Sequence, residues 1–216
     1  MNIFRNRNKT GFTLVEMLTT VVIIGILIAL IIPATATVMR STKTTKSAAH
    51  MRQIGTLVQL YTVESNGRLP ASGGPQSDYI MRVIYPLSHD KPYTFDREDT
   101  PIKDTIYNSP LNDDPGRISY AVNGYLRNLS GQPQDAKIQG PMATSIPKPS
   151  ELFYLLESTD SWRAWKKTLG YQGSGKTVNI LFADMHLEQW TQIKMDELSN
   201  GNDHYWRPDK QRQIYP

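Results

Sequence analysis

The chain has 216 residues, enough for one domain of about 150 residues with a modest core beside a long apolar segment near the N-terminus. Its formal charge is +4, but Arg5, Arg7 and Lys9 precede the apolar segment; without these three of its 24 basic residues, 21 basic residues face 20 acidic ones. This near balance gives no reason to expect nucleic-acid binding, and the absence of cysteine excludes disulfides.

The apolar segment covers residues 12–39, and Glu16 is its only ionisable side chain. It is longer than the roughly 20 residues that cross a hydrocarbon core. A carboxylate at membrane depth costs about 2.5–3.5 kcal/mol on insertion scales, so such a residue usually has a function. We therefore predict one membrane-spanning helix and select Glu16 as its functional residue, the alternative being a tolerated charge near the membrane edge.

A cleaved secretory signal peptide is the competing interpretation of this N-terminus. Such a peptide has basic residues, a short apolar core and small residues at the cleavage site, and Ala34-Thr35-Ala36 could serve as that site. The apolar run is too long for a signal core, and an acid inside it is not expected. Both features favour a segment that stays on the mature protein.

The residues at the start of the apolar run resemble a known processing site. Gly11-Phe12-Thr13-Leu14-Val15-Glu16 is similar to the site of type IV pilins and type II secretion pseudopilins. The resemblance implies that a prepilin peptidase cuts between Gly11 and Phe12 on the cytoplasmic side and methylates the new amine of Phe12. Family members often have lysine directly before the glycine, whereas here Thr10 intervenes and Lys9 stands one place further back.

The resemblance also implies how the segment assembles. Glu16 would pair with the freed amine of Phe12 on a neighbouring subunit, because a buried carboxylate is tolerated only where an opposite charge meets it. Pro33 falls inside the predicted helix, where proline removes a backbone hydrogen bond and loosens or kinks the turn. In pilin-like stems a proline here is thought to allow local melting on assembly; a plain kink near the membrane exit is the alternative.

Charge bias does not orient the helix, because three cations precede it and Arg40, Lys43 and Lys46 follow it. The family resemblance implies a single-pass protein of the inner membrane with its C-terminal head on the periplasmic side. The implied partners are prepilin peptidase, further copies of the chain, other pseudopilins and an inner-membrane assembly platform. A secretion pseudopilus, an adhesive or motility pilus and a DNA-uptake filament all remain open.

The next segment, residues 40–65, is amphipathic. Met51, Ile54, Val58 and Tyr61 recur at helical spacing. We predict one continuous helix from Phe12 to Glu64, ended at Ser65-Asn66-Gly67. Residues 51–61 with Asn66-Gly67-Arg68-Leu69-Pro70 also resemble a large subgroup of pseudopilin-like proteins, which share this helix end and a late hairpin.

The remaining residues, 66–216, predict a small α+β head. Residues 70–116 are expected to be loops around one short helix. Four strands are predicted, at residues 118–122, 151–157, 178–183 and 187–190. The last two flank Asp184-Met185-His186 as a hairpin, in which Met185 replaces the glycine of the subgroup's turn, and Ser174 replaces a histidine ten residues before the aspartate. A three- or four-stranded antiparallel sheet would pack on the second half of the helix, and the tail ending in residues 205–208 is expected to be irregular.

One motif points to a different class of protein. Residues 170–177, from Gly170 to Thr177, match the P-loop pattern G-x-x-x-x-G-K-[ST], so a membrane-anchored domain that binds nucleotide through this loop is the alternative function. A P-loop needs a buried strand before it and a helix after it, so that amides point at the phosphates. Here no hydrophobic strand precedes the loop and a strand pattern follows it.

No other set of residues assembles a catalytic or metal site. Asp184 and His186 are two residues apart and lack further ligands, and Asn112-Asp113-Asp114 supplies too few oxygens for a calcium loop. We therefore predict a structural subunit that is not an enzyme and needs no cofactor. Its expected divisions are a leader (1–11), a transmembrane assembly helix (12–39), an amphipathic continuation (40–65) and a globular head (66–216).

Overall fold

The computed structural model describes residues 11–70, 79–89, 91, 102, 105–112, 119–126, 140–158, 163–164, 177–201 and 203–207. The chain divides into two compact units, Met1–Thr42 and Lys43–Pro216. In chain order the elements are α1 (Leu14–Glu64), α2 (Tyr79–Ser88), β1 (Tyr120–Asn123), η1 (Ala143–Ser145), η2 (Pro149–Glu151), β2 (Phe153–Glu157), β3 (Arg163–Ala164), β4 (Thr177–Phe182), β5 (Leu187–Thr191), α3 (Gln192–Gly201) and η3 (Asp203–Tyr205).

Helix α1 confirms the prediction of one helix that continues from the apolar segment into the amphipathic one. It ends at Glu64, as predicted, and begins two residues after Phe12 because Thr13 takes the N-cap position. At the C-terminal end, Asn66 and Gly67 both have positive φ, 53° and 80°. The Gly67 N–H donates to the carbonyl of Thr62 over 2.8 Å, the five-residue return of a Schellman motif.

The described strands form one five-stranded sheet in the order β3-β1-β2-β4-β5. The pairs β1–β2, β2–β4 and β4–β5 are antiparallel, which confirms the predicted antiparallel sheet. The two-residue strand β3 adds a parallel edge to β1 that the sequence did not indicate. The register of β2 shifts between Phe153 and Leu155, so Tyr154 and Leu155 contribute to the same core.

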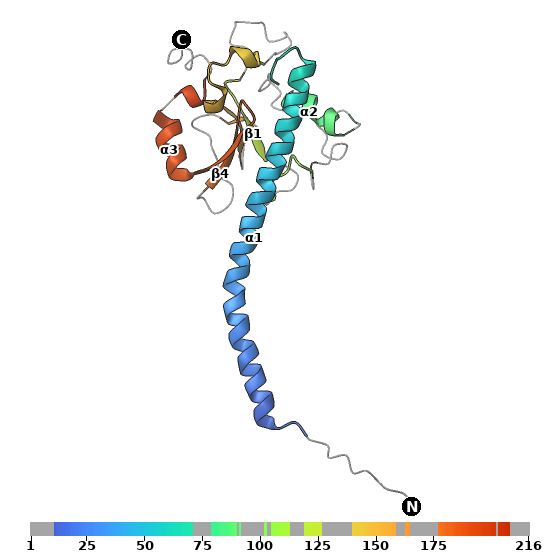
Figure 1. Cartoon of the computed structure of the whole chain (residues 1–216), viewed down its shortest axis with the longest axis vertical. Coiled ribbons are helices and arrows are strands. Elements are labelled where there is room, and N and C mark those ends of the chain that lie inside the picture. Colours follow the sequence, from blue (N-terminus) through green and yellow to red (C-terminus); the bar gives the residue numbers. More distant parts are fainter. Residues whose placement is uncertain are drawn as a thin grey trace, which may run out of the picture. The chain divides into compact units, whose positions relative to one another are not determined.

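The sheet of the second unit carries a hydrophobic core on each face. One core joins α1 and α2 to the sheet through Met51, Ile54, Val58, Ile84 and Leu181. The other is aromatic and lies under α3 and η3. Figure 1 shows the sheet between the C-terminal half of α1 and helix α3. Three layers therefore form this unit, where a sheet packed on the helix alone was expected.

The C-terminal segment differs from the predicted irregular tail. Residues 192–201 form α3 and residues 203–205 form η3, so that prediction was wrong for this part. Trp206 is fully buried, and its ring meets Phe153 edge-on at 5.2 Å between centroids. The carbonyl of Trp206 accepts a hydrogen bond from Asn123 Nδ2 over 2.8 Å. Burial of Trp206 against the sheet is the tertiary contact that orders this segment.

Candidate functional site

The predicted processing site lies immediately before α1. Gly11, Phe12 and Thr13 have no helical or strand assignment, and the helix begins at Leu14. A Cβ atom at Gly11 would meet nothing within 4 Å, and the Phe12 side chain is 75% exposed. The bond between Gly11 and Phe12 therefore lies in accessible, non-helical chain within the described residues.

Thr13 and Glu16 form a reciprocal capping box at the first turn of α1. The backbone N–H of Thr13 donates to Glu16 Oε2 over 2.8 Å, and the backbone N–H of Glu16 donates to Thr13 Oγ1 over 3.3 Å. The Thr13 hydroxyl donates to the same Oε2 over 2.8 Å. Two of the N–H groups that a helix start leaves unpaired are thereby satisfied, as expected for the sequence Thr-x-x-Glu.

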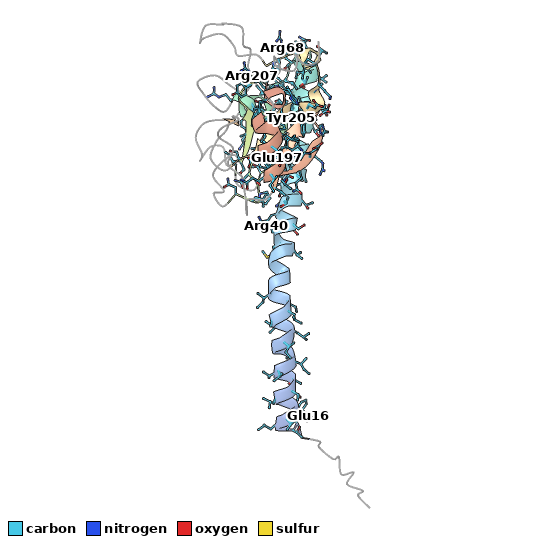
Figure 2. All side chains as sticks on the ribbon, turned by 90° about the vertical axis from the view of Figure 1, so that its left-hand side faces the viewer. Glu16, Arg40, Arg68, Glu197, Tyr205 and Arg207 are labelled. Carbon is cyan, nitrogen blue, oxygen red and sulfur yellow. The ribbon has the colours of Figure 1, made fainter. Side chains whose placement is uncertain are left out.

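The capping box leaves one carboxylate oxygen of Glu16 available. Both bonds from Thr13 go to Oε2, and Oε1 accepts no hydrogen bond from any residue that the structure describes. Figure 2 shows Glu16 at the N-terminal end of α1, where its side chain is exposed. A cation from outside the chain can therefore reach Oε1 without breaking the cap.

The N-terminal part of α1, which includes Glu16, exposes apolar side chains on all sides. Its segment Leu14–Ile32 is long and apolar enough to cross a membrane, and none of it is buried. Thr19, Thr20 and Thr35 each donate the side-chain hydroxyl to a carbonyl three or four residues earlier, so these polar groups are paired within the helix. A single N-terminal apolar helix of this kind is typical of pilin anchors and indicates single-pass membrane association.

Gly11, Phe12 and Glu16 thus come together at the start of α1, whereas Pro33 lies further along the same helix. Sequence reasoning had paired Glu16 only with the amine of Phe12. It did not identify Thr13 as the partner of Glu16 within the chain. The signal was present, because Thr-x-x-Glu before an apolar run is the sequence pattern of a capping box.

The hairpin between β4 and β5 confirms the predicted turn. Met185 has a φ of 68°, in the left-handed region where the subgroup has glycine. His186 Nδ1 lies 2.5 Å from Asp184 Oδ1, and His186 Nε2 lies 3.6 Å from Glu188 Oε1. The described residues contain no group of three or more His, Cys, Asp or Glu side chains that could hold a metal ion.

Two weaker candidates fall on parts of the chain that are not described. In the glycine loop, residues 170–176 lie outside the described residues. Asp113 and Asp114 also lie outside them, while Asn112 donates its side-chain amide to Ser119 Oγ over 2.8 Å. The nucleotide loop and the calcium loop remain sequence hypotheses.

The sequence also did not indicate a buried polar cluster, which lies at residues 44–47 of α1. It contains Glu157, a carboxyl group that is 1% exposed, together with Ser47 and Asn179. From the sequence, Glu157 was only the last residue of an apolar strand. No local pattern could show that Ser47, 110 residues earlier, is its hydrogen-bond partner.

Comparison with known proteins places a motif on the same N-terminal residues. The family model for the prokaryotic N-terminal methylation motif matches residues 6–32. Neither the curated proteins nor the solved structures give a match. The motif indicates prepilin-like processing. Residues 6–32 carry the N-terminal methylation motif, and with it the chain bears the signature of type IV pilins and pseudopilins.

Proposed function

We propose that the chain is a structural subunit of a type II secretion-type pseudopilus or a type IV pilus, processed between Gly11 and Phe12 and polymerised through α1. Prepilin peptidase removes residues 1–11 and methylates the amine of Phe12. The observation that carries the proposal is that Glu16 Oε1, four residues after Phe12, accepts no hydrogen bond from the described residues and lies at the start of an exposed apolar helix.

In this proposal Glu16 sets the stagger between packed helices. A carboxylate buried among apolar helices without a partner costs several kcal/mol, roughly 3–5 when one member of a buried pair is removed. The methylated amine of Phe12 on a neighbouring subunit supplies the opposite charge at Oε1. Only one axial register brings these two groups together, so the ion pair selects that register.

The remaining parts follow from this arrangement. Residues 12–39 form the membrane stem and filament core, residues 40–65 continue the helix onto the head, and residues 66–216 form the head on the periplasmic side of the inner membrane. Pro33 allows the stem to melt locally on assembly. The partners are prepilin peptidase, further copies of the chain, other pseudopilins and the inner-membrane assembly platform. The subunit itself catalyses no reaction.

The intact mass of the full chain purified from membranes tests the processing step. Expressed with a prepilin peptidase, the chain is expected to lose residues 1–11 and to gain one methyl group on Phe12. The matched control is the same chain from a host that lacks the peptidase, which should keep Met1. A mature protein that begins at Met1 despite the peptidase, or that begins beyond Ala36, contradicts the proposal.

A further inference from the structure

Five polar side chains from five parts of the unit Lys43–Pro216 meet in its interior, and each is at most 3% exposed. They are Ser47 on α1, Ser109 in the loop before β1, Tyr120 on β1, Glu157 on β2 and Asn179 on β4. All five lie within the unit Lys43–Pro216. Among the described side chains of α1, Ser47 is the first that is buried.

The carboxyl group of Glu157 is the centre of this cluster. Ser47 Oγ donates to Glu157 Oε1. The side-chain amide of Asn179 donates to the same oxygen over 3.1 Å, and its backbone N–H donates to Oε2 over 2.9 Å. Glu157 therefore joins one turn of α1 to two neighbouring strands.

Two further hydroxyl groups, those of Tyr120 and Ser109, contact Ser47. Its Oγ lies 3.0 Å from the Tyr120 hydroxyl and accepts a hydrogen bond from Ser109 Oγ over 3.1 Å. The Asn179 amide also reaches the backbone carbonyl of Thr44 over 3.4 Å. The turn of α1 at residues 44–47 is thus held by polar contacts, whereas the turns after it are held by apolar packing.

No cation balances Glu157 among the described residues. The titratable group that faces it from β1 is Tyr120, whose pKa is raised by burial, so the phenol stays protonated near neutral pH. On β4 the facing residue, Asn179, is uncharged. On α1, Lys43 and Lys46 are exposed, and His50 is hydrogen-bonded to the carbonyl of Asn108.

Burial and hydrogen bonding act on the carboxyl group in opposite directions. Burial raises the pKa of Glu157 above the ordinary value of 4.5, and the bonds from Ser47 and Asn179 lower it by less. A group whose pKa is raised on folding contributes its full stabilisation at pH values below its pKa in the unfolded chain. That stabilisation is lost as the pH rises through the pKa of the group in the folded protein.

We propose that Glu157 is a proton-sensitive latch. When the carboxyl is protonated its O–H donates to Ser47 Oγ, the Ser47 hydroxyl turns to Tyr120, and the Ser47 turn of α1 is held to β2 and β4; deprotonation loosens this turn. The ionised form is a buried charge for which the described residues provide no counter-ion, and admitting water or separating the elements relieves it. Within the unit Lys43–Pro216, Ser47 is the first buried residue of α1, so opening there releases the helix face that packs on the sheet from its N-terminal end. The proposal does not depend on processing or polymerisation.

Hydrogen exchange on the full chain in detergent, from about pH 4 to pH 8, tests the latch. Expressed as protection factors, which remove the intrinsic effect of pH, protection of residues 44–51 should fall as the pH rises above 4.5. The loss should be about tenfold for each pH unit between the folded and unfolded pKa values of Glu157. Residues 54–64, held by apolar contacts, should change less.

Three glutamine variants identify the group responsible. Glu157→Gln should abolish the pH dependence at residues 44–51, whereas Glu197→Gln, an exposed position on α3 (Figure 2), should keep it. His50→Gln removes the other titrating group nearby and should also leave the dependence intact. If Glu157→Gln does not fold, the wild-type exchange profile decides alone. Protection that stays flat or rises with pH overturns the proposal, as does an infrared carboxylic-acid band that disappears at or below pH 4.5.

Discussion

Thr13 and Glu16 are hydrogen-bonded in both directions, at 2.8 Å from the Thr13 N–H to Oε2 and at 3.3 Å from the Glu16 N–H to the Thr13 hydroxyl. Glu16 therefore has two separable properties, an acceptor oxygen that caps α1 and a negative charge. Glutamine keeps the first property at this helix position and loses the second. Threonine to valine at position 13 does the reverse, because it removes the cap hydroxyl and leaves the charge.

We predict that Glu16→Gln keeps membrane insertion but lowers incorporation into filaments by about tenfold or more, because a buried pair that loses a partner costs more than the 1.4 kcal/mol that corresponds to a factor of ten. The measurement is the fraction of the chain in sheared filaments relative to the membrane fraction. Glu16→Ala and Glu16→Val should show the same defect.

Thr13→Val is the matched control for this pair. It should weaken the cap by about 0.5–2 kcal/mol and leave incorporation near the wild-type level. Wild-type filament yield from Glu16→Gln would contradict the charge role. Equal losses from Thr13→Val and Glu16→Gln would assign Glu16 to capping alone.

Among the described glycines of α1, Gly55 is the one that packs closely on β4. A Cβ atom there would lie 3.3 Å from Leu181 Cδ2 and 3.6 Å from the sulfur of Met185. Gly55→Leu should overpack this contact and destabilise the head by about 1–3 kcal/mol. Gly55→Ala should be close to neutral, since a small shift of Leu181 is offset by about 1 kcal/mol of helix propensity. Denaturant midpoints of the full chain in detergent measure both, and a leucine variant as stable as the alanine one would refute the packing argument.

Trp206 is the anchor of the C-terminal segment. Its indole N–H is buried and has no hydrogen-bond partner among the described residues. Trp206→Ala should cost about 3–5 kcal/mol and release α3 and η3, because the aromatic core loses its largest fully buried side chain. Trp206→Phe should cost well under half as much, since it keeps a ring and removes an unpaired donor. Thermal unfolding, together with hydrogen exchange at residues 192–201, distinguishes the two variants. Equal losses of stability in Trp206→Ala and Trp206→Phe would show that the indole N–H does have a partner.

We predict that protonation of His50 destabilises the fold at acid pH. Partial burial lowers its pKa below the ordinary value of 6.5, the bond to the Asn108 carbonyl opposes this, and the charge of Lys46 lowers it further. The pKa of His50 is lower in the folded protein than in the unfolded chain. Its contribution to the stability of the fold is therefore complete above pH 6.5 and is lost as the pH falls through the folded-state pKa. Glu157 contributes in the opposite direction over part of this range, so the measurement is the difference between the wild type and His50→Gln. Relative to the variant, the denaturant midpoint of the wild type should fall on acidification below pH 6.5, and equal pH profiles of the two proteins would exclude a contribution from His50.

The sequence by itself determined the features that depend on neighbours along the chain. The apolar run after Gly11-Phe12 predicted α1, and the spacing of Met51, Ile54 and Val58 predicted the face that packs on the sheet. Asn66-Gly67 predicted the helix end, and two β-type runs around Asp184-Met185-His186 predicted the hairpin. Periodicity and turn chemistry act over a few residues, so they can be read without the fold.

Tertiary structure alone decided the features that join distant residues. The parallel edge β3, the ordering of α3 by Trp206 and the meeting of Ser47 with Glu157 over 110 residues have no local signal. For the candidate site the sequence identified Gly11, Phe12 and Glu16, while the structure showed which oxygen of Glu16 the cap occupies. Burial and pairing of a polar group depend on what the fold places beside it. Local periodicity therefore could not predict the buried carboxyl cluster.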